Sequence, residues 1–390
     1  MSFLAQNTTP CRPSEKNGRT LLSNSQCATC APVSAVLHDN LGRTIDYLRI
    51  SLTDRCNLRC VYCMPENGVP SLDHHDILSL EEIERIVRIA ARRGIKHVRL
   101  TGGEPLVRKG ISDLIRKLKQ IPEIESIALT TNGILLPTMA SELKEAGLDR
   151  VNISLDSLDP AQYHAITRRG NLDEVLTGIE IALKYFNLVK INVVVVRHLQ
   201  QDLLSFAQLT REKPLHVRFI EYMPIGNTQD YLPPALYPCP CSQNTIPESD
   251  NLPWTEDDVV PTSEVLQNLR ERIKEKGWGD IIPLNSSDDN KAPYGWGPAS
   301  YMKINGAQGT IGFISAMSNH FCASCNRIRL TADGKLRPCL FSDTELDFKS
   351  ALRKGKTEDV EALLDEALRI KPEGHHNQKG TRRAMSKIGG

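Results

Sequence analysis

From Asp46 onward, short apolar runs rich in β-branched residues alternate with longer runs whose apolar residues recur at the helical period. The expected strands are residues 47–52, 97–100, 126–129, 151–155, 189–196 and 217–220, and the expected helices are 80–93, 111–118, 138–146, 172–185 and one near Leu203. About six strand–helix units in a row favour a parallel sheet with both faces covered. The pattern therefore predicts an α/β fold, a partial (β/α)6 barrel of the TIM type.

The segments on either side of this alternating region lack its regular strand–helix pattern. Residues 1–43 show no periodicity and predict a mobile N-terminal extension to the barrel at 44–223, while residues 224–257 predict a Pro-rich loop. Residues 258–390 predict an irregular α+β segment that closes the barrel mouth. Its expected elements are a helix at 262–276, strands at 301–304 and 310–314, a helix at 358–370, and a polar tail that ends in Gly-Gly.

Charge and composition exclude several classes of protein. A formal net charge of +1 gives no overall field toward nucleic acid or a membrane, and the longest apolar stretch, Val193–Val196 with its flanks, is too short to span a bilayer. Residues 1–7 lack the features of a secretory signal. We expect a cytoplasmic protein, with an organellar matrix left open because residues 1–40 are rich in Ser and Thr and poor in acids. Eleven cysteines, an odd number in tight clusters, indicate metal binding rather than disulfides.

A first cysteine triad follows the first expected strand directly. Cys56, Cys60 and Cys63 have the spacing C-x3-C-x2-C, which brings three thiolates into one loop and suits three irons of a cubane cluster. The fourth iron is then open to the amino and carboxylate groups of a methionine-type ligand, whose S–C5′ bond one electron would break. A structural zinc loop is the alternative, but zinc needs a fourth ligand, and no His or Cys lies within ten residues.

A second triad, Cys322, Cys325 and Cys339, lies near the other end of the chain with the spacing C-x2-C-x13-C. Taken alone it is equally consistent with a zinc site, which His320 could complete. Arg327 and Arg329 project to the same side of an extended chain beside it, and two guanidiniums there suit an anion such as a phosphate. The alternative is a solvated charged strand.

The first triad resembles that of the radical S-adenosylmethionine (SAM) superfamily. Thr101-Gly102-Gly103-Glu104-Pro105, at the end of the second expected strand, resembles the GGE element of that superfamily, where a residue without a Cβ lets the backbone meet the methionine amino group. The resemblance implies that a deoxyadenosyl radical is made from SAM at a 4Fe–4S cluster.

Beyond the superfamily, the chain resembles the GTP 3′,8-cyclase family of molybdenum cofactor biosynthesis. The stretches that carry this resemblance are residues 46–65, 98–105, 129–133, 150–156, 217–224, 321–340 and the terminal Ile388-Gly389-Gly390. The resemblance implies two 4Fe–4S clusters, on Cys56, Cys60 and Cys63 and on Cys322, Cys325 and Cys339, with the second binding the guanine of GTP.

Matched positions imply further site residues. For GTP and its triphosphate these are Arg49, Arg99, Thr130, Lys190, Arg218, Arg327 and Arg329. For SAM they are Tyr62, Gly103, Ser154 and Met223, and the glycine tail that enters the active site is Gly389 and Gly390. A triphosphate needs convergent cations in a partly dry site, although each cation could instead pair with a carboxylate.

The implied reaction is a radical cyclisation, in which hydrogen is taken from the ribose C3′ and the carbon radical attacks C8 of guanine. The implied product is 3′,8-cyclo-7,8-dihydro-GTP. The implied partners are an electron donor such as flavodoxin or ferredoxin and a downstream cyclic pyranopterin monophosphate synthase. A homodimer is left open, because the sequence does not fix the oligomeric state.

The sequence departs from the family pattern at His97, where a lysine is usual, so one triphosphate contact is expected to be weaker or sensitive to pH. The loop at 229–254, with Cys239 and Cys241, is longer than expected, and Cys11, Cys27 and Cys30 lie outside the matched region. Two alternatives stay open. One is another radical SAM enzyme, with an auxiliary cluster, that modifies peptides, and the other is a non-enzymatic zinc or redox-sensing scaffold.

Overall fold

A computed structural model describes residues 36–69, 72–73, 75–225, 256–284, 295–375, 381 and 383–389. The residues from 34 to 390 form one compact unit. Cys11, Cys27, Cys30, Cys239, Cys241 and Gly390 lie outside the described residues, as do most of the predicted extension and loop. The predicted domain boundaries therefore stay predictions.

The described strands form one twelve-stranded sheet in the order β12-β11-β10-β1-β2-β3-β4-β5-β6-β9-β8-β7. They are β1 Tyr47–Ser51, β2 His97–Thr101, β3 Ser126–Thr131, β4 Arg150–Ser154, β5 Val189–Val195, β6 His216–Glu221, β7 Ile281–Pro283, β8 Ser300–Ile304, β9 Thr310–Ile314, β10 Arg327–Leu330, β11 Lys335–Arg337 and β12 Leu346–Asp347. The run from β10 through β1 to β6 and β9 is parallel throughout, and the outer strands are antiparallel.

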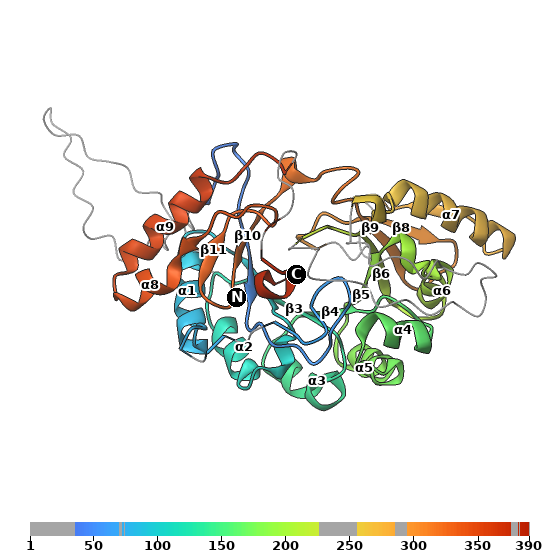
Figure 1. Cartoon of the computed structure of the whole chain (residues 1–390), viewed down its shortest axis with the longest axis horizontal. Helices are drawn as coiled ribbons and strands as arrows, with labels where there is room; N and C mark the ends of the chain where they lie inside the picture. Colours follow the sequence, from blue (N-terminus) through green and yellow to red (C-terminus); the bar gives the residue numbers. More distant parts are fainter. Residues whose placement is uncertain are drawn as a thin grey trace, which may run out of the picture. The chain divides into compact units, whose positions relative to one another are not determined.

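The helices α1 to α6 connect the parallel strands and cover their outer side, whereas the C-terminal helix α10 lies within the curve of the sheet (Figure 1). The described helices are α1 Leu80–Arg92, α2 Ile111–Lys119, α3 Leu136–Glu145, α4 Pro160–Thr167, α5 Leu172–Tyr185, α6 Leu203–Glu212, α7 Thr262–Glu275, α8 Phe348–Arg353, α9 Thr357–Arg369 and α10 Met385–Ile388. A capping box starts α1: Ser79 accepts from the Glu82 backbone N–H and the Glu82 side chain accepts from that of Ser79.

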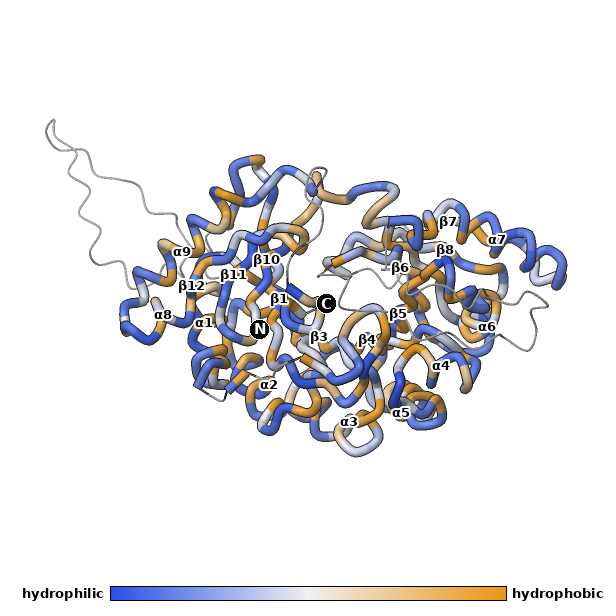
Figure 2. Tube along the Cα trace, viewed as in Figure 1, coloured by the Kyte–Doolittle hydropathy of each residue, from blue (hydrophilic) through white to orange (hydrophobic). Residues whose placement is uncertain are grey.

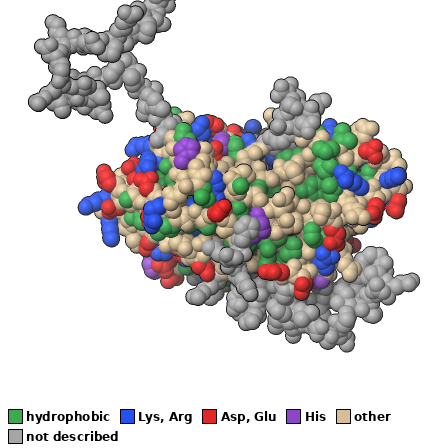
Figure 3. All heavy atoms as spheres, turned by 90° about the horizontal axis from the view of Figure 1, so that it is seen from above, with side chains coloured by type: hydrophobic (Ala, Val, Ile, Leu, Met, Phe, Trp, Pro, Cys, Tyr) green, Lys and Arg blue, Asp and Glu red, His purple; other side chains and the backbone are tan. Residues whose placement is uncertain are grey.

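The apolar residues that predict these elements form the core. Leu48, Val98, Ile127 and Val151 on neighbouring strands are fully buried, and Figure 2 shows hydrophobic residues along the strands and on the helix faces toward them. Figure 3 shows acidic and basic side chains interspersed on one face, in keeping with the near-neutral charge. No helix among the described residues is long and apolar enough to cross a membrane.

The mixed α/β class and the parallel sheet are confirmed. The C-terminal segment contributes strands at both edges of the sheet, because β10 pairs with β1 and β9 pairs with β6. The strand carrying Arg327 and Arg329 thereby becomes the neighbour of the strand that leads into the first triad. The register sets Arg327 beside Tyr47, so Cys325 lies near the amino end of β1, whereas the first triad follows the carboxyl end of β1.

Candidate active site

The first triad lies on a loop that curls back on itself after β1. The backbone N–H of Leu58 donates to Cys56 Sγ (3.4 Å), and that of Cys63 donates to the Cys60 carbonyl (2.9 Å). Arg59 Nη1 donates to the carbonyls of Cys56 and Leu58, at 2.6 and 2.8 Å. All three cysteines are partly buried and free of disulfides. The loop thus holds three thiols near one another at the carboxyl end of β1.

The predicted SAM-binding turn packs directly on this loop. Gly103 donates its N–H to the Thr53 carbonyl (2.7 Å), and a Cβ on Gly103 would stand 2.3 Å from the Arg55 carbonyl oxygen, so no larger residue fits. The buried Glu104 accepts hydrogen bonds from Thr131 Oγ1 and the Asn132 N–H, both at 2.7 Å. Burial raises the pKa of Glu104 to about 7. These contacts join the ends of β1, β2 and β3.

The other predicted SAM residues divide between two places. The Tyr62 hydroxyl donates to the carboxylate of the buried Asp156, just beyond Ser154 at the end of β4, and Asp156 also accepts from the Val194 N–H at 2.8 Å. Burial raises the pKa of Asp156 to about 6. Met223 instead lines the pocket of the second triad.

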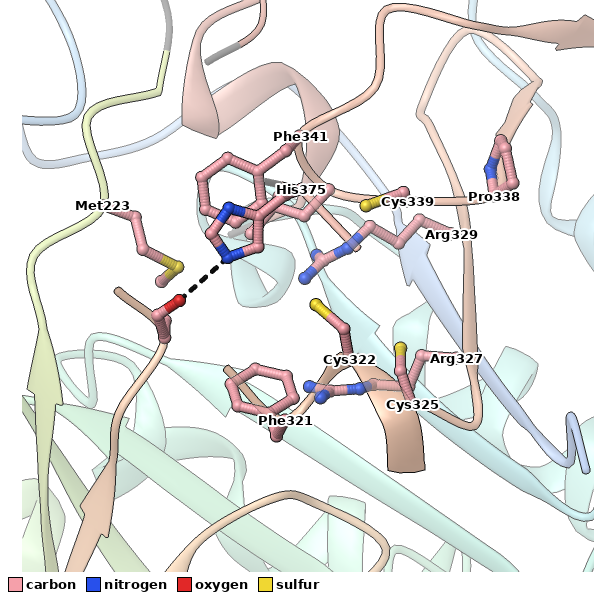
Figure 4. A pocket seen from close by; sticks show the side chains of 12 residues that line it. Met223, Phe321, Cys322, Cys325, Arg327, Arg329, Pro338, Cys339, Phe341 and His375 are labelled. Carbon is pink, nitrogen blue, oxygen red and sulfur yellow. Dashed lines mark hydrogen bonds between the residues drawn. The ribbon is translucent and has the colours of Figure 1, made fainter. Parts of the chain in front are cut away.

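The second triad opens onto this pocket (Figure 4). Cys322 is the first residue of a short 3-10 helix, Cys322–Ser324, Cys325 follows this helix directly, and Cys339 follows β11. The guanidiniums of Arg327 and Arg329 point into the pocket, as the spacing of the two residues predicts. His320 Nδ1 lies 2.9 Å from the Ala316 carbonyl oxygen.

The distances between the thiols test whether either triad could hold a single zinc ion. Among the described residues, three candidate ligand atoms all within 4.8 Å of one another occur only at the exposed group Asp73, His75 and Asp76. A tetrahedral zinc site holds its sulfur ligands about 2.3 Å from one ion, so the sulfurs lie within about 4 Å of one another. Thiolates on different irons of a cubane lie further apart, so the spacing of the thiols does not favour a single zinc ion at either triad.

The two triads differ in their electrostatic surroundings. Burial raises the pKa of Cys56 to about 11 and that of Cys63 to about 12, and the neighbouring thiols and Asp156 add to the effect of burial at Cys60. At Cys325 burial acts the same way, but the cations of Lys371 and Arg327 outweigh it and lower the pKa to about 7.

The predicted GTP residues converge from several strands. Arg49 on β1 is in register with Arg329 on β10 and Arg99 on β2. Arg99 Nη1 donates to Thr130 Oγ1 (3.2 Å). Lys190 on β5 donates to the Tyr301 hydroxyl at 2.9 Å.

These cations repel one another. Burial lowers the pKa of Lys190 to about 5, aided by Arg218, Arg99 and Arg150. Burial and then Arg327 lower the pKa of Arg329 to about 10. Among the described residues, no ion pair joins Arg99, Arg218, Arg327 or Arg329 to a carboxylate. A bound polyanion would relieve this repulsion.

The C-terminal tail runs between the triads. The backbone of Ser386 hydrogen-bonds to Cys63, and the buried Ile388 packs in a cluster that includes Cys339. The Gly389 carbonyl accepts from Arg49 Nε (2.8 Å) and Arg329 Nη1 (2.9 Å).

Gly389 itself is tightly enclosed. Its φ is +71°, and a Cβ there would stand 2.4 Å from Thr101 Oγ1 and 3.1 Å from Ser51 Cβ. Both the backbone conformation and the space therefore select glycine.

Sequence reasoning missed several neighbours of these residues. Trp296 stacks on His97, with ring centroids 3.8 Å apart, and its ring lies 4.0 Å from the guanidinium carbon of Arg150. Asp156, Lys371 and Arg43 were missed as well. Asp156 directly follows a predicted strand and could have been found from that position, whereas the other contacts arise from segments whose pairing the local pattern does not predict.

Comparisons with known proteins agree with this geometry. The Radical SAM superfamily model matches residues 50–209, and the Molybdenum Cofactor Synthesis C model matches residues 245–377. Among solved structures, Streptococcus suis SuiB bound to precursor peptide SuiA has a TM-score of 0.53 at 14% identity, over 86% of this chain and 67% of that one. SuiB bound to S-adenosylmethionine has a TM-score of 0.50 at 15% identity, over 80% of this chain and 65% of that one. At such identities the likeness concerns the fold alone.

The parallel sheet, the cysteine loop at the end of strand β1 and the matching superfamily model define a radical SAM protein. Curated relatives narrow the assignment. The chain is 48% identical to the GTP 3′,8-cyclases of Pelotomaculum thermopropionicum and Moorella thermoacetica over 359 residues, which is 91% of this chain and 100% of each relative. The chain belongs to the GTP 3′,8-cyclase family.

Proposed function

We propose that this chain is a radical SAM GTP 3′,8-cyclase, which converts GTP to (8S)-3′,8-cyclo-7,8-dihydroguanosine 5′-triphosphate in the first step of molybdenum cofactor biosynthesis. The observation that carries the proposal is the buried cluster of mutually repelling cations that extends to the second triad, with Arg49 and Arg329 in adjacent register. A triphosphate supplies negative charge that would offset this repulsion.

In this proposal Cys56, Cys60 and Cys63 hold the first 4Fe–4S cluster, which with SAM supplies a 5′-deoxyadenosyl radical when bound. Gly103 offers its close-packed backbone to the methionine end of SAM. Tyr62, Ser154 and Met223 are the proposed remaining SAM contacts.

Cys322, Cys325 and Cys339 are proposed to hold a second 4Fe–4S cluster that binds the guanine. Arg327 and Arg329 then lie between the base and the cations that hold the triphosphate, which are Arg49, Arg99, Lys190 and Arg218, helped by Thr130. Holding both ends of GTP fixes the ribose between them, which lowers the entropic cost of the cyclisation. The role of the chain's own residues is thus to orient GTP and exclude water.

The tail is proposed to complete the site. The Gly389 carbonyl accepts hydrogen bonds from Arg49 and Arg329 and thereby orients both guanidiniums. Gly390 extends the tail by one residue. We also propose that the parallel strands form a partial (β/α)6 barrel whose mouth the C-terminal segment closes. The remaining proposals are a flavodoxin or ferredoxin donor, a downstream cyclic pyranopterin monophosphate synthase, a homodimer and a cytoplasmic location.

Anaerobic turnover tests the function. Protein reconstituted with iron and sulfide is incubated with dithionite, SAM and GTP, and the products are separated by chromatography and mass spectrometry. We expect 5′-deoxyadenosine and a cyclised isomer of GTP in equal amounts. Deoxyadenosine without loss of GTP would keep the superfamily assignment and refute the substrate, and zinc without iron would refute both.

A further inference from the structure

Lys371 is buried beside the second triad, just after α9 ends at Arg369. Its ammonium donates to the carbonyls of Arg327 and Pro338, each at 2.7 Å, and lies 3.6 Å from Cys325 Sγ. An ammonium has three N–H donors and no acceptor, so these contacts use all of its hydrogen-bonding capacity.

The two carbonyls belong to the segments that carry the cysteines. Arg327 is two residues after Cys325, and Pro338 directly precedes Cys339. A single side chain therefore joins the strand that follows one thiol to the turn that presents another. Without Lys371, both carbonyls would lose a charged donor, although the pairing of β10 with β11 would still join their strands.

Cys322, the remaining cysteine of the triad, is joined to the segment that follows Lys371 by Arg43. The buried Arg43 donates to the Cys322 carbonyl (2.8 Å) and the Pro372 carbonyl (2.8 Å), and its Nε pairs with Asp39 at 2.5 Å. The backbone of His375 also hydrogen-bonds to Cys322. Residues 371–375 thus contact Cys322 and Cys325 and reach the neighbour of Cys339.

The charge of Lys371 is otherwise unbalanced. Among the described residues, no ion pair joins Lys371 to a carboxylate, although a buried ammonium is costly without a negative partner. The negative group it faces is the sulfur of Cys325. A cluster held by three thiolates would carry that negative charge and would gain more of it on reduction.

We propose that Lys371 is a positioning residue of the second triad: it holds the Cys325 and Cys339 segments together, and its fixed positive charge favours the reduced state of the cluster bound there. This inference rests on the proposed second 4Fe–4S cluster. A hydrogen bond to a ligand sulfur and a nearby charge both change the reduction potential of an iron–sulfur cluster.

The test uses the full chain with Cys56, Cys60 and Cys63 changed to Ala, so that all remaining iron belongs to the second site. In this parent, Lys371→Met removes the charge and the donors, and Lys371→Arg keeps the charge. Lys349→Met is the matched control, because Lys349 also donates to a carbonyl, that of Asp76 at 2.7 Å, but lies on α8. Circular dichroism checks folding, and Lys371→Gln replaces Lys371→Met if that variant does not fold.

Iron per chain and the midpoint potential from an anaerobic redox titration are measured for each variant. We expect about four irons in the parent and the Lys349→Met control. In Lys371→Met we expect either loss of at least half of this iron or a potential lower by at least 59 mV, a tenfold shift for one electron. Lys371→Arg should keep the parent's potential within that margin.

Folded Lys371→Met with the parent's iron content and potential would overturn the inference while leaving the second cluster intact. A fall in potential shared by Lys371→Arg would overturn the role of its charge. A folded parent without iron would overturn the second cluster, and the role of Lys371 with it. Turnover of GTP by the unmutated chain is measured separately. Failure of the role of Lys371 can therefore be distinguished from failure of the proposed cyclase function.

Discussion

The two cysteine triads lie in different electrostatic settings. At the first, burial, neighbouring thiols and Asp156 raise the pKa of Cys60 well above its usual value, although Arg59 lies in the same loop. The second lies among cations, which bring the pKa of Cys325 to about 7. The cation-rich surroundings of the second suit a polyanionic substrate, whereas the first presents hydrogen-bonding backbone at Gly103. The surroundings thus add to the difference in cysteine spacing that distinguishes the proposed roles.

The largest expected difference comes from removing one thiol in each triad. Cys60→Ala should bring SAM cleavage below detection, because it removes a ligand of the cluster that supplies the radical. Cys325→Ala should abolish the cyclised product but leave slow formation of 5′-deoxyadenosine. Both products are quantified by chromatography under anaerobic conditions. Equal loss of deoxyadenosine in the two variants would contradict a division of roles.

Removal of the C-terminal tail should stop cyclisation of GTP without loss of either cluster. A chain without Gly389 and Gly390 loses the carbonyl that orients Arg49 and Arg329, so we expect cyclisation to stop while both clusters stay bound. Gly389→Ala should have a similar effect because its Cβ would lie 2.4 Å from Thr101 Oγ1. Iron content and product formation are measured together. Unchanged turnover in either variant would refute a role for the tail.

Arg218 offers a test of the cation cluster away from both triads. Its Nε donates to Asn192 Oδ1 at 2.9 Å, and no carboxylate among the described residues forms an ion pair with it. Arg218→Gln should raise the KM for GTP about 10–100-fold, the value of one charge-assisted hydrogen bond, and leave iron content unchanged. Arg270→Gln, at an exposed position of α7, is the control. A KM within twofold of wild type would contradict the proposed contact.

The lowered pKa of Lys190 predicts a dependence on pH. The amine binds a proton near pH 10.5 when unfolded but only near pH 5 when folded, so between these values the free energy of unfolding falls as the pH falls. A bound triphosphate should raise this pKa, so GTP binding at pH 8 should take up as much as about one proton. Calorimetry in buffers of different ionisation enthalpy measures this uptake. Lys190→Met should take up correspondingly less, and equal uptake in the two proteins would refute the assignment.

The smallest expected effect concerns the anchor of the tail. Arg383 makes two hydrogen bonds to Asp333, both at 2.9 Å, and pairs with Glu345 at 2.8 Å. Arg383→Gln should cost about 1–2 kcal/mol of tail docking and lower turnover about 5–30-fold without changing iron content. Arg369→Gln, in an exposed pair on α9, should change nothing. A loss of iron in Arg383→Gln would show that the residue supports the clusters instead.

Much of the sheet could be predicted, because local periodicity encodes it. The bounds expected for α5 and β9 agree with the structure, and those for β1 and α1 differ by one residue. The helix α4 was missed because its apolar residues do not gather on one face, although Asp159-Pro160 provides a cap and a first-turn proline that could have revealed it.

The site was predictable only in part. Residues of the first triad and its GGE turn are adjacent in sequence or at successive strand ends, so pattern alone brings them together. The pairing of β10 with β1, which sets Arg329 beside Arg49, is a long-range contact that no local signal encodes. The same holds for Lys371 and Arg43, whose partners are backbone carbonyls distant in sequence.

Transfer of hydrogen from the substrate is the most direct test of the central claim that the first triad acts on a ligand held by the second. GTP deuterated at C3′ is turned over anaerobically with unlabelled SAM and dithionite, and the 5′-deoxyadenosine is examined by mass spectrometry. The account predicts one deuterium in the deoxyadenosine, matched by an equal amount of cyclised product. Deoxyadenosine without deuterium would contradict it.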